Sequence, residues 1–287
     1  MFREIPLVTS LGHTLQVRQF QSSSKRGAVI ISSATGVLQN YYYKFALFLN
    51  QNGFTVYTFD YYGIGKTGDS IKKLKSNTIT LSEWGNNDQA SVLALARNEH
   101  PSEELTLISH SIGGQLFGLN PNYHMVNKAI MVASQSGYWK YYKGIHSPKM
   151  WLFWHVMIPA LTPVFGYFPA KKIKLFENLP KNVAYEWKKW GKHKDYMFGS
   201  VSPENLYFKD INIPMLFLGF PRDIFAPKEA IEWLASRYSS AQVENRYIIP
   251  ENEGLPEIGH FGFFRENFRK SLWASSLKWI EKEAGRS

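Results

Sequence analysis

The feature of this sequence that most constrains its fold is the junction Leu107-Ile-Ser-His-Ser-Ile-Gly-Gly114, where a strand-like run meets a helix start with almost no loop. At so sharp a turn, Ser111 is forced into a strained backbone conformation that pushes its side chain out of the sheet. Strand and helix nearly touch there, so the positions two residues to either side must be small, and Ser109 and Gly113 fill them. We expect the Ser111 hydroxyl to be a nucleophile; the alternative is that it only caps the helix.

Short apolar runs alternate with helical patterns along most of the chain. Strands are predicted near Leu7 and at residues 14–20, 28–32, 55–59, 105–108, 128–133, 214–219 and 243–249. Helices are predicted at residues 41–52, 82–99, 227–237 and 266–282, with Ser82 as the N-cap of the second. Such alternation predicts an α/β fold, a mostly parallel sheet with helices on both faces.

The alternation is interrupted once, between Ser136 and the strand at 214–219. This stretch contains five of the nine tryptophans, and from Ser136 to Asp210 it carries twelve lysines, no arginine and five acidic residues. It does not continue the strand–helix pattern. We therefore predict a core made of residues 1–135 and 209–287, with residues 136–208 inserted as an aromatic-rich cap.

Residues 150–168 form a run of 19 residues without Lys, Arg, Asp or Glu, close to the length of a membrane span. Pro159 and Pro163 should break the continuous helix that a bilayer requires. We expect instead a cap helix of about ten residues that ends near Pro159 and faces the core or a substrate. Contact with a membrane interface is the alternative.

A serine nucleophile needs a base, and the base needs an acid to orient it. His260, with glycines at 259 and 262, is the histidine expected on a loop after the last strand, and Asp223 follows the strand at 214–219. The loop after the strand at 128–133 reads Ser-Gln-Ser-Gly and offers no carboxylate. The order Ser111, Asp223, His260 matches a known order of such triads. Turn and packing roles are the alternatives for Asp223 and His260.

Two backbone N–H groups are candidates to stabilise an oxyanion. Ile112 opens the helix after Ser111, where N–H groups lack partners. Val37 lies in the loop Ser32-Ser-Ala-Thr-Gly-Val37 after an early strand, although an ordinary strand-to-helix turn would also explain that loop.

Composition limits the remaining functions. The chain has no cysteine, which excludes thiolate metal sites and a cysteine nucleophile, and we predict no metal and no cofactor. Its formal charge of +10 fits a solvated basic face or attraction to an anionic surface, with a membrane surface as a possible partner. No zinc-finger, RRM or basic-zipper pattern supports nucleic acid binding. The N-terminus has no signal-peptide pattern, so we expect a cytoplasmic protein; the oligomeric state is left open.

A glycine-rich stretch, Asp60-Tyr-Tyr-Gly-Ile-Gly-Lys-Thr-Gly68, formally resembles two nucleotide-binding motifs. A phosphate-binding loop requires glycine where this chain has Asp60, whose carboxylate would repel phosphate. A dinucleotide fingerprint must open directly into a helix, whereas residues 69–77 read as a polar basic loop. A simple turn after a strand fits better.

Taken together, these pieces resemble the α/β-hydrolase superfamily, and most closely a bacterial branch of predicted α/β hydrolases without an assigned substrate. The matching segments are Ala34-Thr-Gly-Val37, Phe59-Asp-Tyr-Tyr-Gly-Ile-Gly65, Ser109-His-Ser-Ile-Gly-Gly114, Arg222-Asp-Ile-Phe-Ala-Pro227 and Gly259-His-Phe-Gly-Phe-Phe264. The resemblance implies an α/β-hydrolase fold with an inserted lid and no cofactor. It places nucleophile, acid and base on Ser111, Asp223 and His260, and the oxyanion donors on Val37 and Ile112.

The expected reaction is hydrolysis of an ester, or a related acyl bond, through an acyl-enzyme on Ser111. Aromatic side chains of the cap, among them Trp139, Trp151 and Trp154, are expected to bind a small apolar acyl substrate. Two alternatives stay open: an acyltransferase that uses the same acyl-enzyme, and a non-catalytic ligand-binding protein on the same fold.

Overall fold

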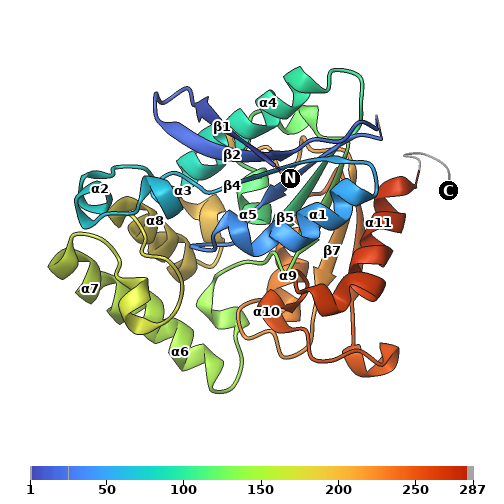
Figure 1. Ribbon diagram of the computed structural model, residues 1–287. Coiled ribbons are helices and arrows are strands. Elements are labelled where there is room, and N and C mark those ends of the chain that lie inside the picture. Colours follow the sequence, from blue (N-terminus) through green and yellow to red (C-terminus); the bar gives the residue numbers. More distant parts are fainter. Residues whose placement is uncertain (1, 25, 283–287) are drawn as a thin grey trace.

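The computed structural model describes residues 2–24 and 26–282 and is built around one eight-stranded sheet with the strand order β1-β2-β4-β3-β5-β6-β7-β8 (Figure 1). Only β2 runs against the other described strands. The strands are β1 (Arg3–Val8), β2 (Thr14–Phe20), β3 (Ala28–Ser32), β4 (Thr55–Phe59), β5 (Leu105–His110), β6 (Lys128–Val132), β7 (Pro214–Gly219) and β8 (Gln242–Tyr247).

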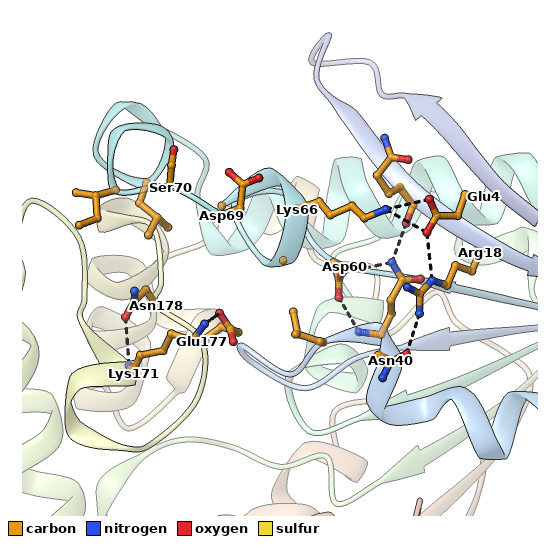
Figure 2. A pocket seen from close by; sticks show the side chains of 17 residues that line it. Glu4, Arg18, Asn40, Asp60, Lys66, Asp69, Ser70, Lys171, Glu177 and Asn178 are labelled. Atoms are coloured by element: carbon orange, nitrogen blue, oxygen red, sulfur yellow. Dashed lines mark hydrogen bonds and ion pairs between the residues drawn. The ribbon is translucent and has the colours of Figure 1, made fainter.

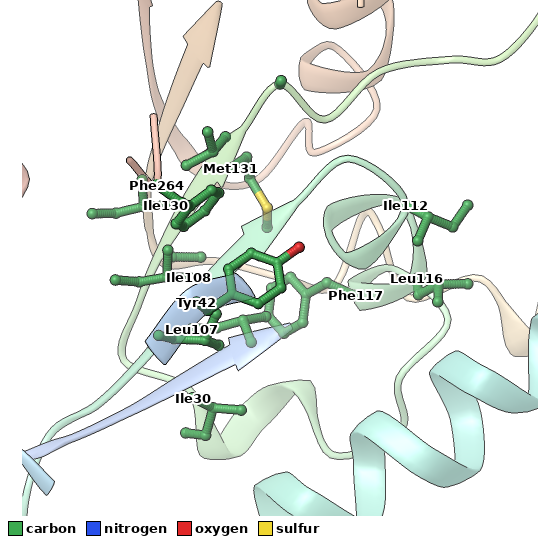
Figure 3. Packing of buried hydrophobic residues seen from close by; sticks show 14 of the residues in the cluster. Ile30, Tyr42, Leu107, Ile108, Ile112, Leu116, Phe117, Ile130, Met131 and Phe264 are labelled. Atoms are coloured by element: carbon green, nitrogen blue, oxygen red, sulfur yellow. The ribbon is translucent and has the colours of Figure 1, made fainter. Parts of the chain in front are cut away.

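The burial of each strand explains its sequence. Every residue of β3, β4, β5 and β6 is buried, which is why these strands read as continuous apolar or small-residue runs covered on both faces. The edge strands β1 and β8 have both exposed and partly buried positions, the exposed ones including Pro6 and Val8 of β1 and Glu244 and Asn245 of β8. Ile108 and Ile130 are in register on the adjacent strands β5 and β6, and Figure 3 shows their side chains on the side of Phe264, away from the helix that carries Leu116 and Phe117.

Helices connect the strands and cover the sheet (Figure 1). The longer ones in the core are α1 (Tyr43–Gln51), α4 (Ala90–Glu99), α5 (Ile112–Phe117), α9 (Lys228–Ala235) and α11 (Ala274–Glu281). α4 continues from α3 (Leu81–Glu83) through the wide turn Trp84–Gln89.

The N-cap predicted at Ser82 is wrong by two residues. Thr80 is the N-cap, because its hydroxyl accepts from the Glu83 N–H while the Glu83 carboxylate accepts from the Thr80 N–H. The Ser82 hydroxyl instead donates to Glu186 at 2.6 Å, which ties the core to the inserted segment.

The connection between β6 and β7 contains the predicted cap interval 136–208 and carries α6 (His146–Leu152), α7 (Ile158–Phe165) and α8 (Lys181–Lys192), which lie together at one side of the sheet (Figure 1). The expectation that a helix ends near Pro159 is wrong. A π-type turn, Phe153–Met157, joins α6 to α7, and the helical run continues through Pro163 to Phe165. The wide turn relieves crowding before Pro159, and left-handed Gly166 ends the run.

Among the described residues, no helix has both the length and the apolar character needed to cross a membrane.

Candidate active site

Ser111 lies between the end of β5 and the start of α5 and has the backbone angles φ 52° and ψ −114°. A non-glycine residue with positive φ is strained, and such strain is kept where the surroundings enforce it. The Ser111 N–H donates to the Val132 carbonyl at 2.9 Å. A Cβ atom on Gly113 would lie 2.6 Å from the Ser32 carbonyl oxygen, so strand and helix approach as closely as the sequence predicts.

Asp223 and His260 are brought together from the loops after β7 and β8. The His260 Nδ1 lies 3.0 and 2.8 Å from the two carboxylate oxygens of Asp223. Asp223 Oδ1 also accepts from the N–H groups of Phe225 and Ala226, at 2.8 and 2.9 Å, which fixes the carboxylate. Because the carboxylate can only accept, Nδ1 carries a proton, so Nε2 is the nitrogen available to act as a base.

Ser111 and His260 line the same cavity, of about 480 Å³. Both side chains are largely buried but reach the cavity surface. Ser111 lies at the sharp turn between β5 and α5, which we call the elbow, and His260 lies on α10 (Gly259–Gly262). Asp223 is hydrogen-bonded to His260, and His260 lines the cavity together with Ser111; among the described residues no hydrogen bond joins the Ser111 hydroxyl to the His260 ring. Most of the remaining wall is apolar and comes from the cap and from the loops after β7 and β8, including Phe153, Trp154, Met157, Phe176, Trp187, Phe225 and Phe261.

Of the three tryptophans predicted to bind substrate, Trp154 alone lines the cavity, and its indole N–H donates to the Gly137 carbonyl at 3.0 Å. Trp139 and Trp151 lie outside the lining, which corrects the prediction. Trp151 is 42% exposed and stacks on His155, on another face of the cap helix.

Sequence reasoning missed the other cavity residues of that helix. Met150, Phe153, Trp154 and Met157 recur with helical spacing and face the cavity together. That spacing could have identified these four residues from the sequence. Trp187 of α8 packs on Trp154 with ring centres 4.9 Å apart, and no sequence pattern indicates this contact.

The oxyanion prediction needs one correction. The Val37 N–H already donates to the Ala34 carbonyl at 3.1 Å, and Val37 does not line the cavity. Ala34 and Thr35, from the same loop, line the cavity in place of Val37. Ile112 is the first residue of α5, where N–H groups have no partner within the helix, as predicted.

A buried chain of hydrogen bonds connects three parts of the site. The His110 Nε2 lies 2.9 Å from the His260 carbonyl oxygen, which can only accept, so Nε2 carries a proton. Burial lowers the pKa of His110 well below its usual value, so the ring is neutral and Nδ1 accepts from the Tyr42 hydroxyl at 2.9 Å. The Tyr42 oxygen in turn accepts from the Ala34 N–H at 2.9 Å. Tyr42 and His110 thus link the loop after β3, the elbow and the His260 backbone.

This chain predicts that Tyr42→Phe destabilises the fold by about 1–3 kcal/mol, because the buried Ala34 N–H and His110 Nδ1 both lose a partner. If Ser111 is the nucleophile, kcat should fall more than KM changes, since the variant disturbs positioning and removes no cavity group. Denaturant unfolding and steady-state kinetics measure the two effects. Tyr43→Phe, at the next, half-buried position, is the control, and equal behaviour of the two variants would contradict the positioning role.

A second cavity, of about 450 Å³, lies beside the glycine-rich stretch and is lined by charged and polar side chains (Figure 2). Asp60 accepts from the Gln39 N–H at 2.6 Å, and a Cβ atom on Gly65 would lie 2.5 Å from the Asp60 carboxylate. A larger residue at position 65 would therefore clash with the Asp60 side chain. Burial raises the pKa of Asp60.

Residues 69–77, expected to be a loop, contain the short helix α2 (Ile71–Ser76), which is a further correction.

Comparison with known proteins gives the family and the fold of this chain. The profile of the family Hydrolase_4, described as serine aminopeptidase, S33, matches residues 23–184, more than half of the chain. The chain belongs to this family of hydrolases. The resemblance to the α/β-hydrolase superfamily and the predicted fold class are confirmed. No curated protein matches the sequence.

Solved structures share the fold of this hydrolase over nearly its whole length. DcsB, determined in complex with its substrate analogue, has a TM-score of 0.66 and 14% identity, covering 98% of this chain and 99% of DcsB. The Pyrococcus furiosus esterase Pf2001 has a TM-score of 0.63 and 15% identity, covering 99% and 92%. The esterase EaEST from Exiguobacterium antarcticum has a TM-score of 0.62 and 14% identity, covering 98% and 100%.

Within residues 2–24 and 26–282, no three His, Asp or Glu side chains of this hydrolase gather in a way that could hold a metal ion.

Proposed function

We propose that this hydrolase cleaves an ester, or a related acyl bond, of a small apolar substrate through an acyl-enzyme on Ser111. One observation carries the proposal: the hydrogen-bonded Asp223–His260 pair and the strained Ser111 meet at one cavity. A hydroxyl, a base and an orienting acid in this order are the parts of nucleophilic acyl transfer. The esterases among the structural neighbours have the same fold.

In the proposed reaction the Ser111 Oγ attacks the carbonyl carbon while its proton passes to the His260 Nε2. Asp223, hydrogen-bonded to Nδ1, stabilises the imidazolium that forms. The tetrahedral oxyanion accepts from the Ile112 N–H and, in place of Val37, from the Thr35 N–H. When the intermediate collapses, the alcohol leaves with the proton from His260. Water then attacks the acyl-enzyme by the same steps and releases the acid.

The residues of the cavity wall favour an apolar substrate. Phe153, Trp154 and Met157 face the cavity from the cap, and Phe225 and Phe261 face it from the loops that carry Asp223 and His260. Apolar and aromatic walls favour an acyl chain because its burial removes apolar surface from water.

Fluorophosphonate labelling tests the nucleophile. We expect the wild-type protein to be labelled once, at Ser111, and Ser111→Ala to remain unlabelled, because the reagent phosphonylates a serine activated by a neighbouring base. Mass spectrometry of the intact protein and of its peptides identifies the site. Ser109→Ala is the control, because this buried hydroxyl has no hydrogen-bond partner among the described residues and its loss leaves the elbow small. Labelling that persists in Ser111→Ala would disprove the proposal.

A further inference from the structure

The helical run α6–α7 is apolar on its outer side as well as on the side that lines the cavity. Trp151, Leu152, Val156 and Val164 are 42, 45, 41 and 78% exposed. Ile145, just before α6, is 68% exposed. In Figure 1 α6 and α7 lie at the margin of the molecule, on the side away from β1 and α4. Large apolar side chains that are exposed together on one element indicate a surface that binds another protein, a ligand or a membrane.

The exposed residues form a continuous stripe. Residues 148, 152, 156, 160 and 164 recur every four positions, are all exposed and are Pro, Leu, Val, Ala and Val. Residues four apart lie on the same side of a helix, and the wide turn Phe153–Met157 offsets the gradual drift of such a series. We call residues 145, 148, 151, 152, 156, 160 and 164 the outer stripe.

Lysines predominate around the outer stripe, although Lys143 and Lys171 are paired with Glu229 and Glu177. Between Glu104 and Glu177 the sequence has no acidic residue, and from 136 to 176 it has six lysines and no arginine. Lys149 lies on α6, and Lys172 and Lys174 lie within nine residues of the end of α7; all three are exposed, and so is Lys171, which pairs with Glu177 at 2.7 Å. A second copy of this surface would bring lysines against lysines, which disfavours a symmetric dimer here. An apolar stripe bordered by lysines complements an anionic lipid interface.

The mouth of the cavity shares this character. Lys149 and Lys174 line the cavity while being exposed. Leu175 and Ile224 also line it and are 42 and 47% exposed. A lipid surface that covers the outer stripe would therefore reach the entrance through which an acyl substrate passes.

We propose that the outer stripe docks on an anionic phospholipid surface, with its leucine and valine side chains among the acyl chains and the neighbouring lysines at the headgroups. The docking rests on exposed residues and does not depend on the proposed function. The helical run lies in the plane of the interface, because its inner side, with Phe153, Trp154 and Ile158, is buried against the rest of the protein, and no described helix has both the length and the apolar character to cross a bilayer.

Co-sedimentation of the whole protein with vesicles tests the docking. We expect binding to vesicles of equimolar phosphatidylcholine and phosphatidylserine, and much weaker binding to phosphatidylcholine alone or at high salt. Val164→Asp should weaken binding at least about tenfold, because it places a charge in the stripe. Val8→Asp, at an exposed valine of β1, is the matched control and should bind like wild type. Lys172→Gln should weaken binding about fivefold and Lys270→Gln, on the C-terminal segment, should not.

Three results would overturn the docking proposal. In the first, the wild-type protein stays in solution when it is mixed with the anionic vesicles. In the second, Val164→Asp and Val8→Asp bind the vesicles equally well. In the third, the protein forms a dimer that Val164→Asp dissociates, and it does not bind vesicles. Circular dichroism shows that the exposed-site variants are folded. Ser111→Ala should bind the vesicles like wild type, so failure of the docking and failure of the proposed reaction are separate results.

Discussion

Replacing Asp223 with asparagine is expected to lower kcat for ester hydrolysis by about 10⁴-fold while the protein stays folded. The asparagine oxygen can still accept from the Phe225 and Ala226 N–H groups, which lie 2.8 and 2.9 Å from Asp223 Oδ1. Its amide nitrogen then faces the His260 Nδ1 and donates, so Nδ1 must become the acceptor. The ring proton moves to Nε2, and the nitrogen that should take the Ser111 proton is blocked.

Two measurements check the Asp223→Asn prediction. Steady-state hydrolysis of a soluble short-chain ester gives kcat, and the rate of fluorophosphonate labelling reports on Ser111 without an ester substrate. Both should fall together, and the melting temperature should stay close to that of wild type. Asp195→Asn changes an exposed carboxylate of the cap and should alter neither rate. A labelling rate in Asp223→Asn within about tenfold of wild type would contradict the assigned role of the carboxylate.

Local sequence was sufficient to predict the strands and the elbow. β2 (Thr14–Phe20) and β3 (Ala28–Ser32) have the predicted bounds, because apolar patterning is set by residues that are neighbours in the chain. The sharp turn at Ser111 was predictable from its small neighbours Ser109 and Gly113, although the crowding itself comes from β3, because a Cβ atom on Gly113 would lie 2.6 Å from the Ser32 carbonyl oxygen. Asp223 and His260 were found from the positions at which strands end.

The sequence could not predict which side of a helix faces the cavity, or which residues distant in sequence are in contact. Trp139 and Trp151 were chosen for their aromatic character, but the cap helix has two apolar faces and its packing decides which one meets the cavity. Val37 was excluded by a turn that uses its N–H. Tyr42 and His110 are 68 residues apart, and no pattern in the chain indicates that they share a hydrogen bond.

Gly113→Ala is expected to have the largest effect on stability, a loss of about 3 kcal/mol. In a helix interior alanine normally stabilises a protein relative to glycine by about 1 kcal/mol, so the sign of the change is informative. The added Cβ would lie 2.6 Å from the Ser32 carbonyl oxygen. Ser32 belongs to β3, which pairs with β4 on one side and β5 on the other, so its backbone has little freedom to move away.

Gly262→Ala is the comparison for Gly113→Ala, because Gly262 is also a buried glycine in a helix, α10. At Gly262 the added Cβ would meet side-chain atoms of Ile258 and Phe268 at 3.3 and 3.5 Å, which need little adjustment. Thermal unfolding should show a melting temperature about 5 °C lower for Gly113→Ala and a smaller change for Gly262→Ala. Since any relief of the Gly113 clash displaces α5 from β3, the labelling rate of Ser111 should fall in the same variant. An unchanged or higher melting temperature would mean that strand and helix are not held in contact at the elbow, and the strain on Ser111 would then lack its physical cause.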